Sequence, residues 1–154
     1  MNQPAIDIQA YQIVMTREFN APRETVFRAW TEPEMLKKWF GPEGVNTIAA
    51  EVDLRSGGHY QLTMQEPNGT TIVHGGTYRE IDPPGKLVFT WVLDGQSCEG
   101  SDGRQAETVV TLDFEDRGST TRLTLTHDFL PSERSKEGHT MGWTGSLDRL
   151  ATVV

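Results

Sequence analysis

The C-terminal segment, residues 132–154, constrains the fold of this chain more than any other stretch. Four apolar side chains recur there at spacings of four, three and four residues: Trp143, Leu147, Leu150 and Val154. This spacing predicts an amphipathic helix, and Ser132 stands where its side chain can cap the first turn. Because the preceding residues read as β-strands, the helix has to bury its apolar stripe against a sheet.

Alternation of apolar and polar residues predicts the strands of that sheet. The expected strands are residues 11–19, 45–54, 60–64, 70–81, 86–93, 107–115 and 120–129. Short turns join most of them, which is typical of an antiparallel meander. Inner-facing positions are expected to include Ile48, Leu54 and Phe129. A bulge expected at Gly75-Gly76 leaves the facing of residues 70–81 open.

Two short helices are expected between the first and second strands. The first opens at Asn20 or Ala21 and carries Pro22 in its first position, where the missing N–H is tolerated. Pro33 ends it, and a second helix covers residues 34–39. The expected order is therefore a strand, two short helices, six strands and a long helix.

Composition limits the class of protein and its partners. The chain has 154 residues, enough for a single domain over residues 1–154, with residues 1–10 as a loose lead-in. Hydrophobic residues make up 36% and charged residues 23%, as in globular proteins. The net charge of −8 argues against nucleic acid or an anionic membrane as partner, since both attract basic surfaces.

The N-terminus and the single cysteine indicate a compartment. No basic region leads into an apolar run, so no signal peptide is expected, and no run approaches the roughly 20 residues of a membrane-spanning helix. Cys98 stands alone, which excludes an internal disulfide and a zinc site built from several cysteines. A lone cysteine fits a reducing compartment, and a cytoplasmic location is expected.

Five groups of motifs occur in order along the chain. They are Phe27-x-x-Trp30 with Glu34-x-Leu36-x-x-Trp39-Phe40-Gly41-Pro42; Asp53-x-Arg55-x-Gly57-Gly58; Gly76-x-Tyr78-x-Glu80-Ile81-x-Pro83; Leu87-Val88-Phe89-Thr90-Trp91; and Gly142-Trp143-x-x-x-Leu147-x-x-Leu150. Together they resemble the START-like (SRPBCC) superfamily, in the branch named after the activator of the heat-shock protein 90 ATPase. The resemblance implies an α+β helix-grip fold, in which a curved antiparallel sheet of about seven strands wraps around the C-terminal helix.

The resemblance also implies an apolar cavity between the sheet and that helix. Relatives bind lipids, polyketides, hormones or aromatic compounds there, and some catalyse cyclisation or hydrolysis. The inner-facing residues expected to line the cavity are Tyr60, Leu62, Met64, Tyr78, Phe89, Trp91, Leu112, His127, Trp143 and Leu147. His127 has two readings: a core histidine bonded to a neighbour, or a polar group that fixes a ligand or transfers a proton.

No set of residues indicates catalysis or a cofactor by itself. The four histidines, His59, His74, His127 and His139, lack the spacing of metal ligands, and no glycine-rich nucleotide motif is present. Glu51 and Asp53 share the polar face of a strand and are expected to lie in water. We assign no catalytic residue, no metal and no cofactor from the sequence.

Three functions stay open at this point. A small hydrophobic molecule bound between sheet and helix needs only the apolar inner faces. A cyclase or hydrolase in the same cavity needs two or more converging polar groups, of which only His127 and the tyrosine hydroxyls can be named. An interaction protein that regulates a chaperone is implied by the family branch alone.

Three glycines interrupt the C-terminal helix away from its apolar stripe: Gly138, Gly142 and Gly145. Each lowers helix stability by up to about 1 kcal/mol relative to alanine. Such a face either lets another segment approach closely or leaves the first turns loose over a cavity.

Overall fold

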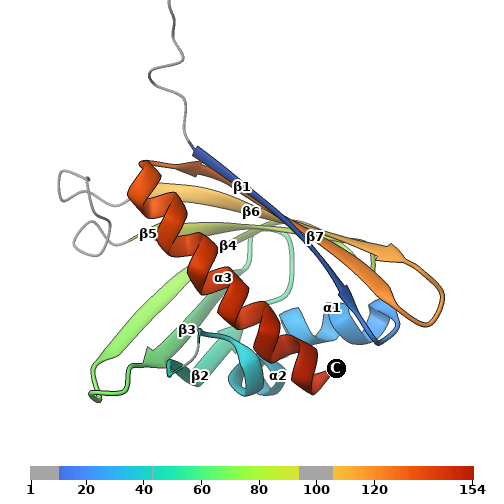
Figure 1. The fold of residues 1–154 in the computed structure, drawn as a ribbon, viewed down its shortest axis with the longest axis horizontal. Coiled ribbons are helices and arrows are strands. Elements are labelled where there is room, and N and C mark those ends of the chain that lie inside the picture. Colours follow the sequence, from blue (N-terminus) through green and yellow to red (C-terminus); the bar gives the residue numbers. More distant parts are fainter. Residues whose placement is uncertain (1–10, 43, 94–105) are drawn as a thin grey trace, which may run out of the picture.

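The computed structural model describes residues 11–42, 44–93 and 106–154 of the chain. Its strands are β1 (Tyr11–Phe19), β2 (Asn46–Val52), β3 (His59–Gln65), β4 (Thr71–Asp82), β5 (Lys86–Leu93), β6 (Ala106–Asp116) and β7 (Thr121–Leu130). Its helices are α1 (Arg23–Thr31), α2 (Pro33–Trp39) and α3 (Glu133–Val153). Within these residues the strands form one antiparallel sheet, ordered β1-β7-β6-β5-β4-β3-β2, and α3 crosses one face of it (Figure 1). The predicted helix-grip fold is confirmed.

Strand β4 changes partner along its length, and this bends the sheet. Its first half pairs with β3 up to Thr77, and its second half pairs with β5 from Tyr78 onward. At the change, a Cβ on Gly76 would overlap the Thr90 carbonyl oxygen. Glycine is therefore required for this close approach of two backbones. β3 and the first half of β4 thus lie outside the backbone pairing with β5.

The facing of β4, which the sequence left open, is settled by burial. His74 is 9% exposed and Tyr78 is 3% exposed, so these two residues point to the inside of the sheet. Beyond Tyr78 the facing reverses, because Ile81 packs against the core and Glu80 is exposed. The expected irregularity also takes a different form. Pairing with β3 is continuous across Gly75 and Gly76, and the register shift lies against β5, between Tyr78 and Glu80.

Two strand predictions were wrong because of bulges. Ile48 was expected to face inward, but it is 48% exposed. It is the extra residue where the pairing of β2 with β3 shifts between Thr47 and Ala49. Thr47 turns inward instead, and its hydroxyl donates to the Phe40 carbonyl at 2.9 Å. Leu54 follows the end of β2 and is 43% exposed.

The second bulge is in β7. Phe129 was expected beside His127 on the inner face, but it is 59% exposed and has a φ of 72°. Between the pairs Tyr11–Leu130 and Ile13–His127, two residues of β7 oppose one residue of β1. This extra residue turns Phe129 outward and brings Leu130 into the core, where it is fully buried.

The short helices follow the predicted pattern with one shift. Helix α1 begins at Arg23, so Pro22 is its N-cap residue and not its first helical residue. Trp30 and Trp39 pack edge to face, with ring centroids 4.7 Å apart. The indole N–H of Trp39 donates to the Ala29 carbonyl at 2.9 Å, which ties α2 to α1.

Helix α3 forms where the apolar spacing in residues 132–154 predicted a helix. The Ser132 hydroxyl accepts a hydrogen bond from the Ser135 amide at 3.0 Å, which satisfies one free N–H of the first turn. Trp143, Leu147 and Leu150 are buried against the sheet. The predicted apolar stripe therefore belongs to the same core cluster as the inner residues of the sheet.

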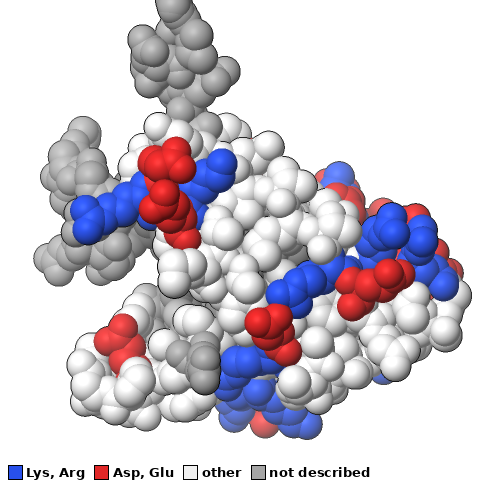
Figure 2. All heavy atoms as spheres, viewed as in Figure 1, with Lys and Arg blue, Asp and Glu red and all other residues white. Residues whose placement is uncertain are grey.

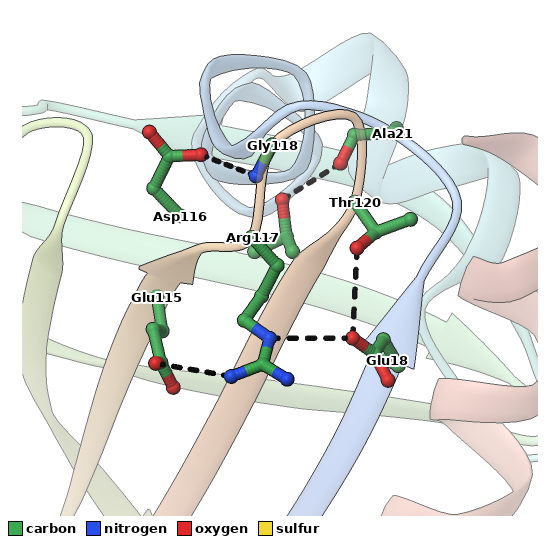
Figure 3. Close-up of polar contacts among 8 residues, drawn as sticks. Glu18, Ala21, Glu115, Asp116, Arg117, Gly118 and Thr120 are labelled. Atoms are coloured by element: carbon green, nitrogen blue, oxygen red, sulfur yellow. Dashed lines mark hydrogen bonds and ion pairs between the residues drawn. The ribbon is translucent and has the colours of Figure 1, made fainter.

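The turn between β6 and β7 is fastened to the end of β1 (Figure 3). Arg117 lies between Glu18, at 3.7 Å, and Glu115, at 3.5 Å. These ion pairs are exposed and contribute little stability. The buried Thr121 hydroxyl donates to the Ala21 carbonyl at 2.7 Å and holds the start of β7 beside the entry to α1.

The left-handed backbone of Phe129 leads to a stability prediction. A non-glycine residue in this conformation costs roughly 1–2 kcal/mol. We expect Phe129→Gly to raise the free energy of unfolding by about 1 kcal/mol, because the exposed ring contributes little and the strain is removed. Urea denaturation measures the change. Phe129→Ala is the control, since it removes the ring but keeps Cβ; an equal gain from alanine would contradict the explanation.

Candidate ligand-binding cavity

A cavity of about 430 Å³ lies between the N-terminal half of α3 and the sheet. We call it the outer cavity. Its walls are Phe40, Gly41, Pro42, Met64, Trp91, Arg134, Ser135, Gly138, His139, Gly142, Trp143 and Ser146. In Figure 2 the surface is hollowed between this part of α3 and the β3–β4 hairpin. The volume falls in the range of small-molecule sites, about 300–1,000 Å³.

Aromatic rings form the apolar part of the walls. Trp91 packs against Trp143 with ring centroids 5.0 Å apart, and Phe40 packs against both. Met64 completes this side from β3. Such walls suit apolar and flat molecules, because burial of apolar area drives binding and aromatic rings stack on one another.

Two of the three helix glycines border the outer cavity. A Cβ on Gly138 or on Gly142 would meet no atom within 4 Å. The first expectation, close approach by another segment, is therefore not met at these two positions among the described residues. Their missing side chains leave room in the cavity wall.

The loop after α2 forms another wall, and α3 holds it in place. The Arg149 guanidinium donates to the carbonyls of Gly41, Pro42 and Val45 at 3.0, 3.2 and 2.6 Å. The Ser146 hydroxyl accepts from the Gly41 amide at 3.2 Å. One arginine thus satisfies several carbonyl groups that have no strand partner, and it fixes the loop beside the cavity.

A second, much smaller space of about 20 Å³ is lined by residues that are at most 9% exposed. We call it the inner space. Its walls are Trp30, Leu36, Phe40, Tyr60, Leu62, Tyr78, Phe89 and Trp91. Phe40 and Trp91, whose ring centroids are 5.8 Å apart, line both spaces.

The ten residues expected to line one cavity are thus distributed over three places. Met64, Trp91 and Trp143 border the outer cavity. Tyr60, Leu62, Tyr78 and Phe89 border the inner space. Leu112, His127 and Leu147 border neither space and lie in the core, at most 1% exposed.

His127 makes the contacts of a core histidine. Its Nδ1 accepts a hydrogen bond from the Trp143 indole at 3.0 Å, so its Nε2 carries the proton. That Nε2 lies 2.7 Å from the Thr108 hydroxyl, which donates in turn to the Trp91 carbonyl at 2.6 Å. Each polar atom in this series of hydrogen bonds has a partner, and buried polar groups need such partners to be buried at low cost.

His139 borders the outer cavity, and the sequence reasoning missed it. Its Nδ1 lies 2.8 Å from the Ser135 carbonyl, so that nitrogen is the donor. Its Nε2 then accepts from the Trp91 indole at 3.2 Å. The signal was available, because His139 lies four residues before Trp143 and continues the apolar stripe by one helical turn.

The buried imidazoles are neutral. Burial and, to a smaller extent, the neighbouring His139 and His74 lower the pKa of His127 to about 3. Burial likewise lowers the pKa of His74 to about 3. For His139, burial lowers the pKa, and the hydrogen bond to the Ser135 carbonyl opposes the shift. The indole donors require the same state, since a protonated ring has no nitrogen to accept from Trp143 or Trp91.

The remaining sequence expectations concern metals, carboxylates, the cysteine and membranes. Among the described residues, no three His, Cys, Asp or Glu side chains are grouped to hold a metal ion. Glu51 and Asp53 are exposed. Cys98 lies outside the described residues. No helix in the described part of the chain has the length and hydropathy needed to cross a membrane.

The loop held by Arg149 leads to a prediction. Arg149→Ala is expected to lower the free energy of unfolding by about 2–3 kcal/mol, because several carbonyls lose a charged donor. Arg149→Lys is expected to retain only part of the stability that Arg149→Ala loses, since an ammonium group lacks the planar set of donors. Urea denaturation measures both. The control is Arg28→Ala, an exposed arginine 4.0 Å from Glu32, expected to change stability by less than about 0.5 kcal/mol.

The neutral histidines make the fold sensitive to acid. Their folded-state pKa lies below the unfolded value of about 6.5, so the unfolded chain binds more protons as the pH falls. Stability is expected to fall below about pH 6.5, by up to about 1.4 kcal/mol per pH unit for each group. His127→Gln should reduce this slope in urea denaturation at pH 4.5–7. An unchanged slope would refute the assignment; His59→Gln, at an exposed position, is the control.

Known proteins share this architecture. A protein from Nitrosomonas europaea is 28% identical, with a TM-score of 0.75 over 92% of both chains. A protein from Chromobacterium violaceum is 28% identical, with a TM-score of 0.80 over 94% of this chain and 97% of that chain. The AHSA1 protein from Silicibacter pomeroyi is 29% identical, with a TM-score of 0.78 over 92% and 96%.

Sequence comparison gives the family. No curated protein matches this chain. The family described as activator of Hsp90 ATPase homolog 1-like protein matches residues 20–154, which is nearly the whole chain. The match includes the motif groups that suggested the resemblance. This chain therefore belongs to the activator of Hsp90 ATPase homolog 1-like family, within the START-like superfamily.

Proposed function

We propose that this protein binds a small hydrophobic or aromatic molecule in the outer cavity. The observation that carries the proposal is the cavity itself: about 430 Å³, walled by Phe40, Trp91 and Trp143 and widened by glycines on α3. A well-packed core does not leave a space of this size, and an apolar space between elements is where small ligands bind.

The polar groups at the walls fit recognition better than catalysis. His139 has one ring nitrogen occupied as a donor and the other as an acceptor. A general base needs a free lone pair within reach of the substrate, and this imidazole has none while the Trp91 bond is intact. The Ser135 hydroxyl lies 3.4 Å from the donating Nδ1 of His139, so that nitrogen cannot activate it as a nucleophile.

The enzyme and the chaperone-regulating alternatives therefore have less support. A cyclase or hydrolase would need a base outside the network described above. A chaperone partner is suggested by the family description alone, and a shared fold does not transfer a function. Binding of a small apolar molecule requires only groups that the described residues provide.

A thermal-shift measurement with apolar probes tests the proposal. We expect 2-isopropylnaphthalene or decanoate to raise the melting temperature, because a ligand that binds only the folded state stabilises it. At a probe concentration of about 100 Kd the gain is about 2.7 kcal/mol, or roughly 5–10 °C for a chain of this size. No shift with either probe would reject the proposal.

A single substitution separates cavity binding from binding elsewhere. Gly142→Leu places a side chain in the open cavity, so it is expected to abolish the probe-induced shift. The variant should not unfold, because leucine forms helices better than glycine by up to about 1 kcal/mol. The matched control is Met141→Leu, at a neighbouring position that is 75% exposed. An undiminished shift in Gly142→Leu would place the probe outside the cavity.

A further inference from the structure

Trp30, one of the residues that line the inner space, carries a buried hydrogen-bond donor without a partner among the described residues. Trp30 is 3% exposed, and its indole N–H has no acceptor among the described residues. The other three indoles differ: Trp39 donates to a carbonyl, and Trp91 and Trp143 donate to imidazoles. Buried donors in folded proteins are nearly always satisfied, so an exception calls for an explanation.

The position of Trp30 connects this donor to the ligand cavity. Trp30 is a wall of the inner space, and its ring lies 5.9 Å from Trp143 and 6.4 Å from Phe40, both walls of the outer cavity. Phe40 and Trp91 line both spaces. A ligand group that passes between these rings from the outer cavity reaches the inner space.

The size and chemistry of the inner space define what fits there. A volume of about 20 Å³ accommodates one water-sized group. An indole N–H only donates, so the complementary group is an acceptor. Nε2 of His74 is another buried atom without a partner among the described residues, and the His74 ring packs against Trp91 and Tyr60, two walls of this space. A charged group is disfavoured, since the inner space is lined mainly by apolar and aromatic side chains.

We infer that the inner space receives one neutral acceptor oxygen of the ligand, a carbonyl oxygen, which accepts a hydrogen bond from Trp30. This inference rests on the proposed binding of an apolar molecule and narrows it to a class. The apolar body of the ligand occupies the outer cavity, and a single oxygen at its inner end passes the Phe40–Trp91 pair. An anionic end, as in a fatty acid, has to point the opposite way.

Two probes of nearly equal shape test the inference. 2-Acetylnaphthalene carries a carbonyl oxygen where 2-isopropylnaphthalene carries one of its two methyl groups. The protein has 4 tryptophans, so ¹⁵N labelling gives four indole N–H signals that through-bond experiments assign. We expect the acetyl probe to move the Trp30 signal downfield and the isopropyl probe to leave it near its free position. Trp39 is the internal control, because its N–H is already bonded to Ala29 at 2.9 Å.

Affinity gives a second measure. The acetyl probe is expected to bind roughly three- to tenfold more tightly, the usual net effect of one neutral hydrogen bond. Trp30→Phe should remove this preference, and Trp39→Phe, the matched control, should retain it. If Trp30→Phe does not fold, the indole signals of the unaltered protein still show whether the probe oxygen accepts a hydrogen bond from Trp30.

The outcomes separate the two proposals. Binding of both probes with equal affinity and no selective change at Trp30 overturns the inference and leaves the cavity as the ligand site. A downfield shift at Trp91 or Trp143 in place of Trp30 overturns it as well, since the oxygen then stays in the outer cavity. Failure of both probes to bind overturns the inference together with the proposed function.

Discussion

Two hydrogen bonds between indole and imidazole rings join α3 to the sheet, and the cavity depends on them. In one, Trp143 of the helix donates to His127 of β7; in the other, Trp91 of β5 donates to His139 of the helix. Each bond needs a neutral imidazole in one tautomer, and the partners of the other ring nitrogens fix that tautomer. The two tryptophans that wall the outer cavity are thereby held in place from both sides.

The open space follows from features that oppose close packing. Strand β4 pairs with β3 up to Thr77 and with β5 only from Tyr78 onward, beside the close approach of Gly76 to Thr90. Gly138 and Gly142 withhold side chains from the helix face across the gap. Arg149 anchors the loop after α2 through backbone carbonyls, so this wall does not collapse inward. The fold thus keeps an apolar space open with backbone geometry and polar anchors, and its aromatic walls stay ordered.

Much of this architecture could be predicted because its signals are local. The stripe from Trp143 to Leu150 and the alternation in β3 and β5 gave elements whose inner faces are buried in the structure. The misplaced residues, Ile48 and Phe129, lie at bulges, where one extra residue reverses the facing of its neighbours. Sequence alternation cannot report such an insertion, because it depends on the register of the partner strand.

The sequence by itself determined the order of elements, the long apolar stripe and the family, since these rest on residue spacing along one chain. Only the tertiary structure decided which inner residues border open space. Trp91 and Met64 border it, whereas His127 and Leu112 do not, although all four alternate correctly along their strands. Whether an inner face is packed or open depends on how far apart two elements lie. That distance is set by the bend at Gly76 and by ring contacts between residues distant in the sequence.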